Sequence, residues 1–306
     1  MKAIEDLRIL VIGDIMLDKY IVGEVERISP EAPVPIVRVY EEFSSLGGCG
    51  NVVRNIRATG AQVDCVAALA EDSAYFKIIN HLDEIDAGNW TFIGTNVTTV
   101  KERIVANSKR TQMLRIDRES IKPIDCKLII KERLDSYFEQ YIPDFIVVSD
   151  YAKGVVTWGL MQYLKTKCDR IIVDPKPQNS LCYNDVFMIT PNEKEWTQMT
   201  LTSAYRLDNI KYTLITMGKK GMELRDFNQH WTIPAEDVHQ IYNVSGAGDT
   251  VVAIMSVCLS LGFNPIQSAK IANSCASYVV TLPGTEIVPK DYFLKSLKKY
   301  KKQYKI

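Results

Sequence analysis

Apolar residues along this chain gather in short runs, and most of the runs close with polar side chains. Residues 7–12 precede Gly13-Asp14, and residues 145–148 precede Ser149-Asp150. Similar runs occur at residues 63–70, 170–176, 186–192 and 212–218. Short, continuous apolar runs are typical of strands that are buried on both faces of a parallel sheet. The pattern therefore predicts strands whose carboxyl ends carry a rim of polar groups.

Helical spacing of apolar residues separates many of these runs. A glycine-rich stretch at residues 46–50 leads into a predicted helix that Gly60 would end as a C-cap. Further helices are predicted at residues 159–167, 251–261 and 265–280. Strands that alternate with helices build parallel sheets covered by helices on both faces. We therefore predict an α/β fold with a mostly parallel central sheet.

Two stretches break this alternation. Residues 15–42 and 91–118 are rich in β-branched residues, and prolines interrupt the first of them, which restricts it to edge or irregular strands. Asn107-Ser108-Lys109 supplies the turn of a hairpin in the second. We predict one domain over residues 1–306, with a small β-flap built from both stretches. Because a partner often covers edge strands, we expect a homodimer through the flap.

Composition narrows the classes of function. The 306 residues are 46% apolar and 24% charged, and 37 Lys+Arg balance 37 Asp+Glu, so no net charge attracts nucleic acid or acidic lipid. Seven scattered cysteines without a C-x-x-C pair indicate reduced thiols, and three histidines without ligand spacing argue against structural zinc. No signal segment or run of ~20 apolar residues occurs. We expect a cytoplasmic protein that binds neither nucleic acid nor membranes.

The sequence N-V-S-G-A-G-D-T at residues 243–250 carries the most specific chemistry. Gly246 and Gly248 permit a tight turn and a close approach of backbone N–H groups to a ligand. The helix predicted to follow begins with unpaired N–H groups and a partial positive charge, which suits a phosphate. Asp249 lies at the rim of this turn, where a carboxylate can take a proton from an attacking hydroxyl. A helix that is merely capped behind a glycine turn is the simpler alternative.

Two strand ends add candidate ligands. Asp14 follows the first strand, and ligands of open α/β sheets bind at the carboxyl ends of strands. Asn192 and Glu195 lie three residues apart at a helix start, where they could orient a hydrated Mg²⁺ or form a capping pair. Both interpretations of this pair are compatible.

The second β-rich stretch carries three cations, Lys101, Arg103 and Arg115. If these side chains face a cleft they suit a phosphorylated substrate, and if they face outward they form a charged edge. A P-loop is excluded because no G-x-x-x-x-G-K-[ST] is present, and no G-x-G-x-x-G follows the first strand.

Four motifs occur in an order that resembles the ribokinase-type (PfkB) carbohydrate kinases. They are G-D at residues 13–14, G-G-C-G-N at 47–51, T-P-N-E-K-E at 190–195 and G-A-G-D at 246–249. Further motifs resemble the D-glycero-β-D-manno-heptose 7-phosphate kinases of that family: D-I-M-L-D-K-Y at 14–20, R-I-S-P-E-A-P-V-P at 27–35, S-D-Y-A-K-G at 149–154 and D-P-K at 174–176. The resemblance implies a ribokinase-like three-layer core with a β-flap lid. It also implies phosphorylation of C1 of the heptose 7-phosphate, on the route to ADP-heptose for lipopolysaccharide.

The motifs and the resemblance together nominate a site. Asp249 is the candidate base, and the N–H groups of Gly246, Ala247 and Gly248 would stabilise charge on the transferred phosphoryl group. The candidates for binding the sugar phosphate are Asp14, Gly48, Asn51, Lys101, Arg103, Arg115, Asp150 and Lys153. The candidates for binding the nucleotide are Lys176, Asn192, Glu195, Thr216, Gly218 and Gly221, with Asn192 and Glu195 also placing Mg²⁺ through water. ATP and Mg²⁺ are the implied cofactors, and a need for a monovalent cation stays open.

In many relatives a nucleotidyltransferase domain follows the kinase in one chain. This sequence stops soon after Glu286, so the resemblance is to the kinase alone, and we expect a separate nucleotidyltransferase in the pathway. One alternative is a kinase for another sugar or sugar phosphate, such as fructose phosphate or ribose. A second is a non-catalytic sensor of sugar phosphate or nucleotide on the same fold. The intact Asp249 argues against the sensor, which needs no base.

Overall fold

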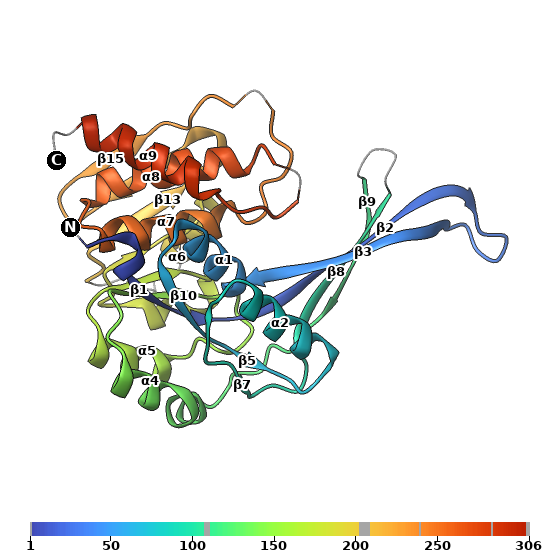
Figure 1. Cartoon of the computed structure of the whole chain (residues 1–306), viewed down its shortest axis with the longest axis horizontal. Helices are drawn as coiled ribbons and strands as arrows, with labels where there is room; N and C mark the ends of the chain where they lie inside the picture. The colour runs from blue at the N-terminus through green and yellow to red at the C-terminus, as the bar shows by residue number, and fades with distance from the viewer. Residues whose placement is uncertain (1, 107–110, 202–208, 239, 283, 304–306) are drawn as a thin grey trace.

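The computed structural model describes residues 2–106, 111–201, 209–238, 240–282 and 284–303, and a long sheet runs through the middle of its core (Figure 1). Nine strands within these residues form this sheet, in the spatial order β15 (His230–Ile233), β14 (Met222–Arg225), β13 (Tyr212–Thr216), β12 (Met188–Ile189), β11 (Ile171–Asp174), β10 (Phe145–Ser149), β1 (Arg8–Gly13), β4 (Gln62–Val66) and β6 (Gly88–Asn89). Every pair from β13 to β6 is parallel, and β14 and β15 are antiparallel. The prediction of a mostly parallel sheet is confirmed.

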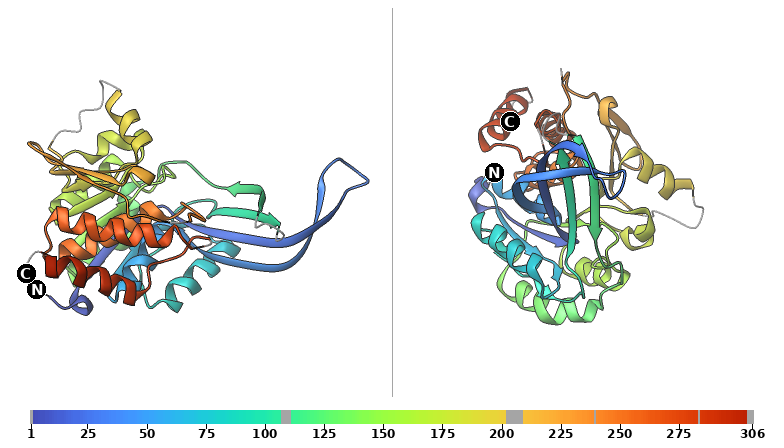
Figure 2. Two further views of the ribbon diagram at one scale, coloured as in Figure 1. Left: turned by 90° about the horizontal axis from the view of Figure 1, so that it is seen from above. Right: turned by 90° about the vertical axis from the view of Figure 1, so that its right-hand side faces the viewer.

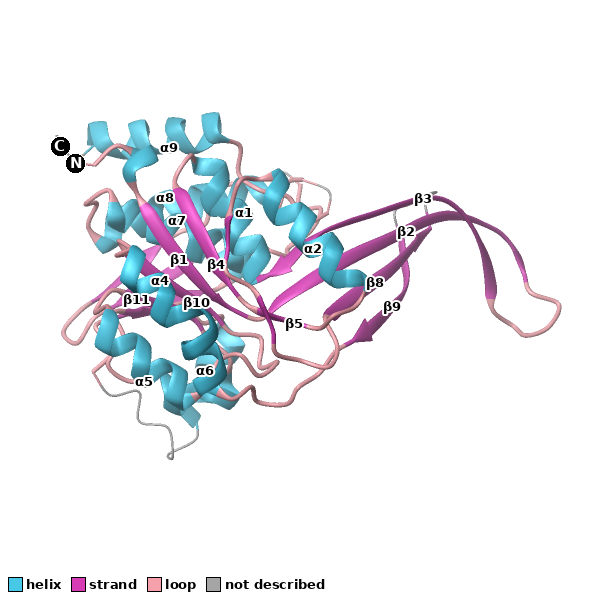
Figure 3. Cartoon of the chain, turned by 60° about the horizontal axis from the view of Figure 1, so that its bottom comes forward, coloured by secondary structure: helices cyan, strands magenta, loops and turns pink. Residues whose placement is uncertain are grey.

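Strand β1 divides the core into two apolar layers because its side chains alternate between the faces of the sheet. Ile9 and Val11 belong to one buried cluster, and Leu10 and Ile12 to the other. The helices that contribute to the first cluster are α1 (Cys49–Thr59), α2 (Ser73–Glu84), α7 (Ala247–Ser260), α8 (Pro265–Val279) and α9 (Lys290–Gln303). The helical segments that contribute to the second cluster are α3 (Cys126–Ile129), the π-helical turn Ile130–Leu134, α4 (Asp135–Gln140), α5 (Trp158–Lys167) and α6 (Glu193–Leu201). Helices therefore cover both faces of the sheet, as predicted (Figure 3).

Local signals set the helix ends. Gly60 ends α1 in the left-handed conformation, with φ of 101°. Asn264 and Gln267 form a capping box at the start of α8, where Pro265 occupies the first turn. These caps satisfy the backbone groups that a helix end leaves unpaired.

A second, four-stranded sheet projects from the core (Figures 1 and 2). We call it the flap; its spatial order is β3 (Pro35–Gly48), β2 (Ile15–Ile28), β8 (Thr99–Ala106) and β9 (Thr111–Arg118). Strand β2 pairs antiparallel with β3 and parallel with β8, so the two β-rich stretches lie side by side. The turn predicted at residues 107–109 lies outside the described residues.

Two predicted boundaries are wrong. The strand expected at residues 63–70 splits, because β4 pairs with β1 whereas β5 (Ala68–Leu69) pairs with β7 (Phe92–Ile93). Helix α7 begins at Ala247 and not at residue 251, because Gly246 adopts the left-handed conformation at φ of 81° and ends the loop there. Asp249 consequently belongs to the first turn of α7. No helix of the described part of the chain has both the length and the apolarity needed to cross a membrane.

Candidate active site

The carboxyl ends of the parallel strands meet at one edge of the main sheet, where a cavity of about 140 Å³ opens. The lining residues come from the ends of the four strands β10 to β13, from the first turn of α6 and from the start of α7: Tyr151, Asp174, Lys176, Thr190, Asn192, Glu195, Thr216, Gly246, Gly248 and Asp249. Open α/β sheets bind ligands at this edge. We call this edge the carboxylate rim.

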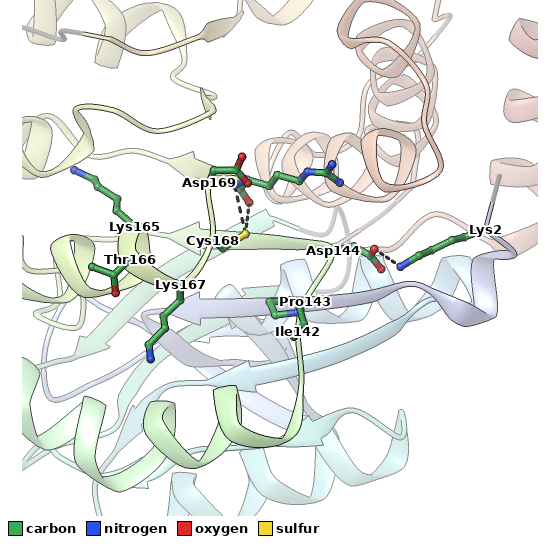
Figure 4. Close-up of a pocket in the computed structure, with 10 residues that line it drawn as sticks. Lys2, Ile142, Pro143, Asp144, Lys165, Thr166, Lys167, Cys168 and Asp169 are labelled. Carbon is green, nitrogen blue, oxygen red and sulfur yellow. Dashed lines mark hydrogen bonds and ion pairs between the residues drawn. The ribbon is translucent and has the colours of Figure 1, made fainter.

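A larger cavity, of about 550 Å³, lies at the opposite edge of the sheet (Figure 4). It is lined by segments that precede β10 and β11, so it faces the amino ends of the strands. Several of its charged side chains already have partners in the protein, since Lys2 pairs with Asp144 across the cavity lining and Lys167 lies over the Phe138 and Tyr163 rings. Figure 4 shows Lys165 and Lys167 pointing in different directions. We therefore place the chemistry at the carboxylate rim.

Asp249 is buried at 5% exposure, and each of its carboxylate oxygens accepts one hydrogen bond. The Asn51 side-chain amide donates to Oδ2 at 2.8 Å, and the Tyr151 phenol donates to Oδ1 at 2.8 Å. Burial raises the pKa of Asp249 to about 6, while both donors oppose the rise. A carboxylate with this pKa is ionised near neutral pH and is a stronger base than an exposed aspartate.

The turn before Asp249 has the shape that its glycines predict. Gly246 is the N-cap of α7, and a Cβ there would lie 2.8 Å from the Asn51 amide nitrogen. A Cβ on Gly248 would meet nothing within 4 Å, which is consistent with a face open to the cavity. The Ala247 amide already donates to the Val244 carbonyl at 3.3 Å, whereas the amides of Gly246 and Gly248 meet no acceptor in the described ranges. Two free amides at a helix N-terminus suit an anionic oxygen.

Asp14 anchors a loop. Its carboxylate accepts the backbone amides of Tyr151, Lys153 and Val155 at 2.8, 3.0 and 3.2 Å. Burial and the nearby Asp150 raise its pKa to about 6. Gly48 packs beside it, since a Cβ on Gly48 would lie 2.3 Å from the Asp14 carbonyl oxygen. The predicted roles of Asp14, Gly48 and Asn51 in binding sugar hydroxyls stay predictions.

Asp150 is fully buried, and both of its carboxylate oxygens accept hydrogen bonds from other groups of the protein. Its carboxylate accepts the Tyr183 phenol at 2.5 Å, the Asn179 amide at 2.8 Å and the Ala152 backbone amide at 2.6 Å. Burial nevertheless raises its pKa. These contacts fix the loop that follows β10.

Asn192 and Glu195 form a reciprocal capping box at the start of α6. Asn192 accepts the Glu195 amide at 2.9 Å, and Glu195 accepts the Asn192 amide at 2.9 Å. The other Glu195 oxygen pairs with the Lys176 ammonium. Next to them, burial raises the pKa of Asp174 to about 8, although Lys176 opposes the rise. In the described part of the chain, no three His, Cys, Asp or Glu side chains are arranged to hold a metal ion directly.

Of four further candidates, Thr216, Gly218, Gly221 and Lys153, one is among the residues that line the cavity. Thr216 lines it, and its amide donates to the Pro191 carbonyl at 2.9 Å. Gly218 and Gly221 form the turn after β13 with positive φ, but neither is among the lining residues. Lys153 forms an ion pair with Glu119 at 2.7 Å.

The flap cations differ in how they are paired. Arg103 forms an ion pair with Asp18 at 2.6 Å, and Arg115 pairs with Asp117 at 2.9 Å on the exposed edge. Among the described residues, no carboxylate lies within ion-pair distance of the Lys101 ammonium, which lies 5.3 Å from the centre of the Tyr151 ring. Burial lowers the pKa of Lys101. Of the three candidate cations, Lys101 is thus the one that lies beside the rim and has no carboxylate partner in the described part of the chain.

Sequence reasoning missed four residues of this region, namely Tyr151, Asp174, Asp18 and Arg54. Arg54 reaches the Asn51 side chain at 3.4 Å and the Thr285 carbonyl at 3.3 Å. The motif at residues 149–154 and the strand end at Asp174 were signals that could have nominated the first two.

Comparisons with known proteins agree with this geometry. The sequence profile of the pfkB family carbohydrate kinases matches residues 6–291. The Bifunctional protein HldE of Helicobacter hepaticus is 36% identical over 305 residues, covering 92% of this chain and 61% of that protein. The protein of the same name from Desulfatibacillum aliphaticivorans is 35% identical over 310 residues, with the same shares covered. The chain spans about three-fifths of the length of these curated relatives.

Solved structures share the fold. Phosphofructokinase-2 from Escherichia coli, in complex with potassium, matches with a TM-score of 0.77 at 16% identity, covering 96% of this chain and 99% of that one. Ribokinase from Thermotoga maritima matches with a TM-score of 0.71 at 18% identity, covering 95% and 99%. The ribokinase-like three-layer fold predicted from the sequence is confirmed.

Proposed function

This chain belongs to the pfkB family of carbohydrate kinases, and we propose that it transfers the γ-phosphoryl group of ATP to the C1 hydroxyl of D-glycero-β-D-manno-heptose 7-phosphate. The observation that carries the reaction class is Asp249, a buried carboxylate with a raised pKa in the first turn of α7. Beside it lie the backbone amides of Gly246 and Gly248, which have no acceptor among the described residues. A proton acceptor next to an anion-binding helix end is what phosphoryl transfer to a hydroxyl requires.

In the proposed reaction, Asp249 accepts the proton of the sugar hydroxyl as its oxygen attacks the γ-phosphorus. The bond from the γ-phosphorus to the bridging oxygen breaks, and ADP leaves with that electron pair. The amides of Gly246 and Gly248 stabilise charge on the transferred phosphoryl oxygens. The protein contributes mainly position and electrostatics, because this chemistry forms no covalent intermediate with a side chain.

The donor set near Glu195 fits Mg²⁺ held through water. Asn192, Glu195 and Asp174 offer oxygen atoms, which Mg²⁺ prefers, and the absence of a direct three-residue cage in the described ranges agrees with an ion that keeps its waters. When bound, the ion would offset negative charge on the ATP phosphates. Lys176, paired with Glu195, lies where it can approach the same phosphates.

The heptose phosphate is proposed from the motifs and from one cation. The stretch R-I-S-P-E-A-P-V-P at residues 27–35 resembles the heptose 7-phosphate kinases, and Lys101 lies unpaired among the described residues beside the rim. A half-buried ammonium without a protein carboxylate gains most from an anionic ligand. We therefore propose that Lys101, rather than Arg103 or Arg115, is the main cation that binds the phosphate group of the sugar.

A coupled ADP-release assay with Mg-ATP tests the substrate. It compares kcat/KM for D-glycero-β-D-manno-heptose 7-phosphate, its α-anomer, fructose 6-phosphate and ribose. The proposal predicts the highest kcat/KM for the β-heptose phosphate. A higher value for another sugar would keep the kinase chemistry and refute the substrate, and ATP binding without turnover on any sugar would favour the sensor.

We further propose that two copies of the chain associate through their flaps. The flap exposes apolar side chains that the described part of its own chain leaves uncovered, including Ile28 at 60%, Val39 at 46% and Leu114 at 53% exposure. Flat strand edges with apolar faces favour pairing with another chain.

Light scattering should give a dimer for the wild type and a monomer for Leu114→Glu. Ile142→Glu, at an apolar site with 90% exposure outside the flap, is the control that should stay dimeric; a monomeric wild type at working concentration would refute this proposal.

A further inference from the structure

The loop after β10 brings one side chain to the base from a distant part of the sequence. Tyr151 lies 98 residues before Asp249 in the chain, and its phenol donates to Oδ1 of Asp249 at 2.8 Å. The opposite oxygen is held by Asn51 from α1. Because each oxygen has its own fixed donor, rotation of the carboxylate about its Cβ–Cγ bond would break both hydrogen bonds.

The backbone of Tyr151 is held as firmly as its side chain. Its amide donates to Asp14 at 2.8 Å, and the amide of the preceding Asp150 donates to the Asp174 carbonyl at 3.0 Å. Ala152, the next residue, adopts a positive φ of 55° and donates to Asp150 at 2.6 Å. A non-glycine residue in this conformation persists where surrounding contacts over-determine it. The buried carboxylates of Asp14 and Asp150 thus hold the loop that presents the phenol.

The ring of Tyr151 lies next to two ammonium groups. Lys101 from the flap and Lys176 from the segment after β11 each lie 5.3 Å from its centre. A cation at this distance from an aromatic ring is attracted to it. The ring therefore lies beside the cations proposed to bind the two substrates. Burial of the phenol, together with the nearby Asp249, raises the pKa of Tyr151 well above its ordinary value, so that the phenol stays a donor.

From these contacts we infer that Tyr151 is a positioning residue, which holds the Asp249 carboxylate in the orientation that accepts the sugar proton. The inference rests on the proposed function, because it takes Asp249 as the base of a sugar kinase. It adds a residue that touches neither reacting atom and acts through the carboxylate. Asn51 holds the second oxygen of the same group.

Tyr151→Phe tests the inference, since it keeps the ring between the two lysines and removes the O–H. We expect kcat to fall about 10–100-fold with little change in either KM, because the base is present but less often oriented. We also expect the acid limb of the kcat/KM profile to move up by about half a pH unit or more, because a donor to the charged carboxylate is lost.

Tyr163→Phe is the matched control. It removes a phenol that donates to Asp135 at 2.7 Å, on a surface away from the cavity. This variant should leave kcat and the pH profile unchanged.

Fluorotyrosine at position 151 gives a second measurement that preserves the shape of the side chain. A more acidic phenol is a stronger donor, so the acid limb should move down. Wild-type kcat and pH profile in Tyr151→Phe would overturn the inference while the kinase reaction stands. A loss of kcat with an unmoved acid limb in both variants would also overturn it, because a merely structural role has that signature. If the wild type turns over no sugar, the proposed function fails and the inference falls with it.

Discussion

The carboxylates of the rim and the charged side chains of the flap are held in different ways. On the rim, Asp14, Asp150 and Asp249 are buried and accept hydrogen bonds from amides and phenols of the chain. On the flap, Arg115 forms a solvent-exposed ion pair with Asp117. Exposed ion pairs of this kind contribute little to the free energy of unfolding. Lys101 lies at the boundary between the two regions, half-buried and without a carboxylate among the described residues. The carboxylates of the rim are therefore held in place before a substrate binds. On the flap, the Lys101 ammonium is left available for an ion pair with the substrate.

The largest effect should come from the rim. Asp249→Asn removes the proton acceptor but keeps a group that can hydrogen-bond, so kcat should fall about 10²–10⁴-fold. ATP binding, measured by calorimetry, should stay close to that of the wild type. Near-normal turnover in this variant would show that Asp249 is not the base. It would then refute the assignment of catalysis to the rim and of substrate binding to the flap.

The next largest effect separates two flap cations. Lys101→Ala should raise KM for the sugar phosphate about 10–100-fold, because a buried charge-assisted contact to the phosphate is lost. Arg115→Ala is the matched change on the exposed edge and should raise KM less than about threefold. Steady-state kinetics with both substrates varied provides both values. Equal effects of the two variants would show that burial does not select the phosphate-binding cation.

The pH dependence of kcat/KM sharpens the account of the rim. Burial raises the pKa of Asp249 to about 6, and the base acts only when it is ionised. We expect kcat/KM to be level above this pH and to fall about tenfold per pH unit below it. A profile that stays flat down to pH 4.5, measured with saturating ATP and a stable enzyme, contradicts this assignment of the base.

The smallest effect concerns stability. Asp14, Asp249 and Asp174 have folded pKa values of about 6, 6 and 8, above their ordinary value of 3.8. The folded chain therefore binds more protons than the unfolded chain between about pH 4 and 8, and its stability falls as pH rises through that window. Asp174→Asn should reduce the fall and raise the melting temperature at pH 8 by roughly 2–4 °C. An unchanged pH dependence of melting would refute the raised pKa of Asp174.

Much of the fold follows from local pattern. Strands such as β1 and β10 are continuous apolar runs, and the polar residues after them mark the sheet edge where the site forms. The start of α7 was misplaced because the left-handed conformation of Gly246 depends on its packing beside Asn51, which is distant in sequence. The split of residues 63–70 likewise depends on which strands pair.

The site was predictable as a set of positions but not as a set of contacts. The order of the motifs identified Asp249, Asn192 and Glu195, and the capping pair that the spacing of the last two predicted is confirmed. The Tyr151 contact could not be derived, because it requires the Asp14 carboxylate to accept three amides of the loop that follows β10, and the pairing of β10 with β1 is not evident from the sequence. The pairing of Arg103 with Asp18 depends on the register between β2 and β8, which the sequence pattern leaves open.

The most direct test of the central claim is a phosphorus NMR measurement of the product. Wild-type enzyme, Mg-ATP and D-glycero-β-D-manno-heptose 7-phosphate should yield ADP and a sugar that carries two phosphorus signals, one of them coupled to the anomeric proton. Asp249→Asn under the same conditions should leave the substrate unchanged. ATP consumption without a second phosphorus on the sugar, or an unreactive heptose phosphate beside a reactive different sugar, would contradict the account.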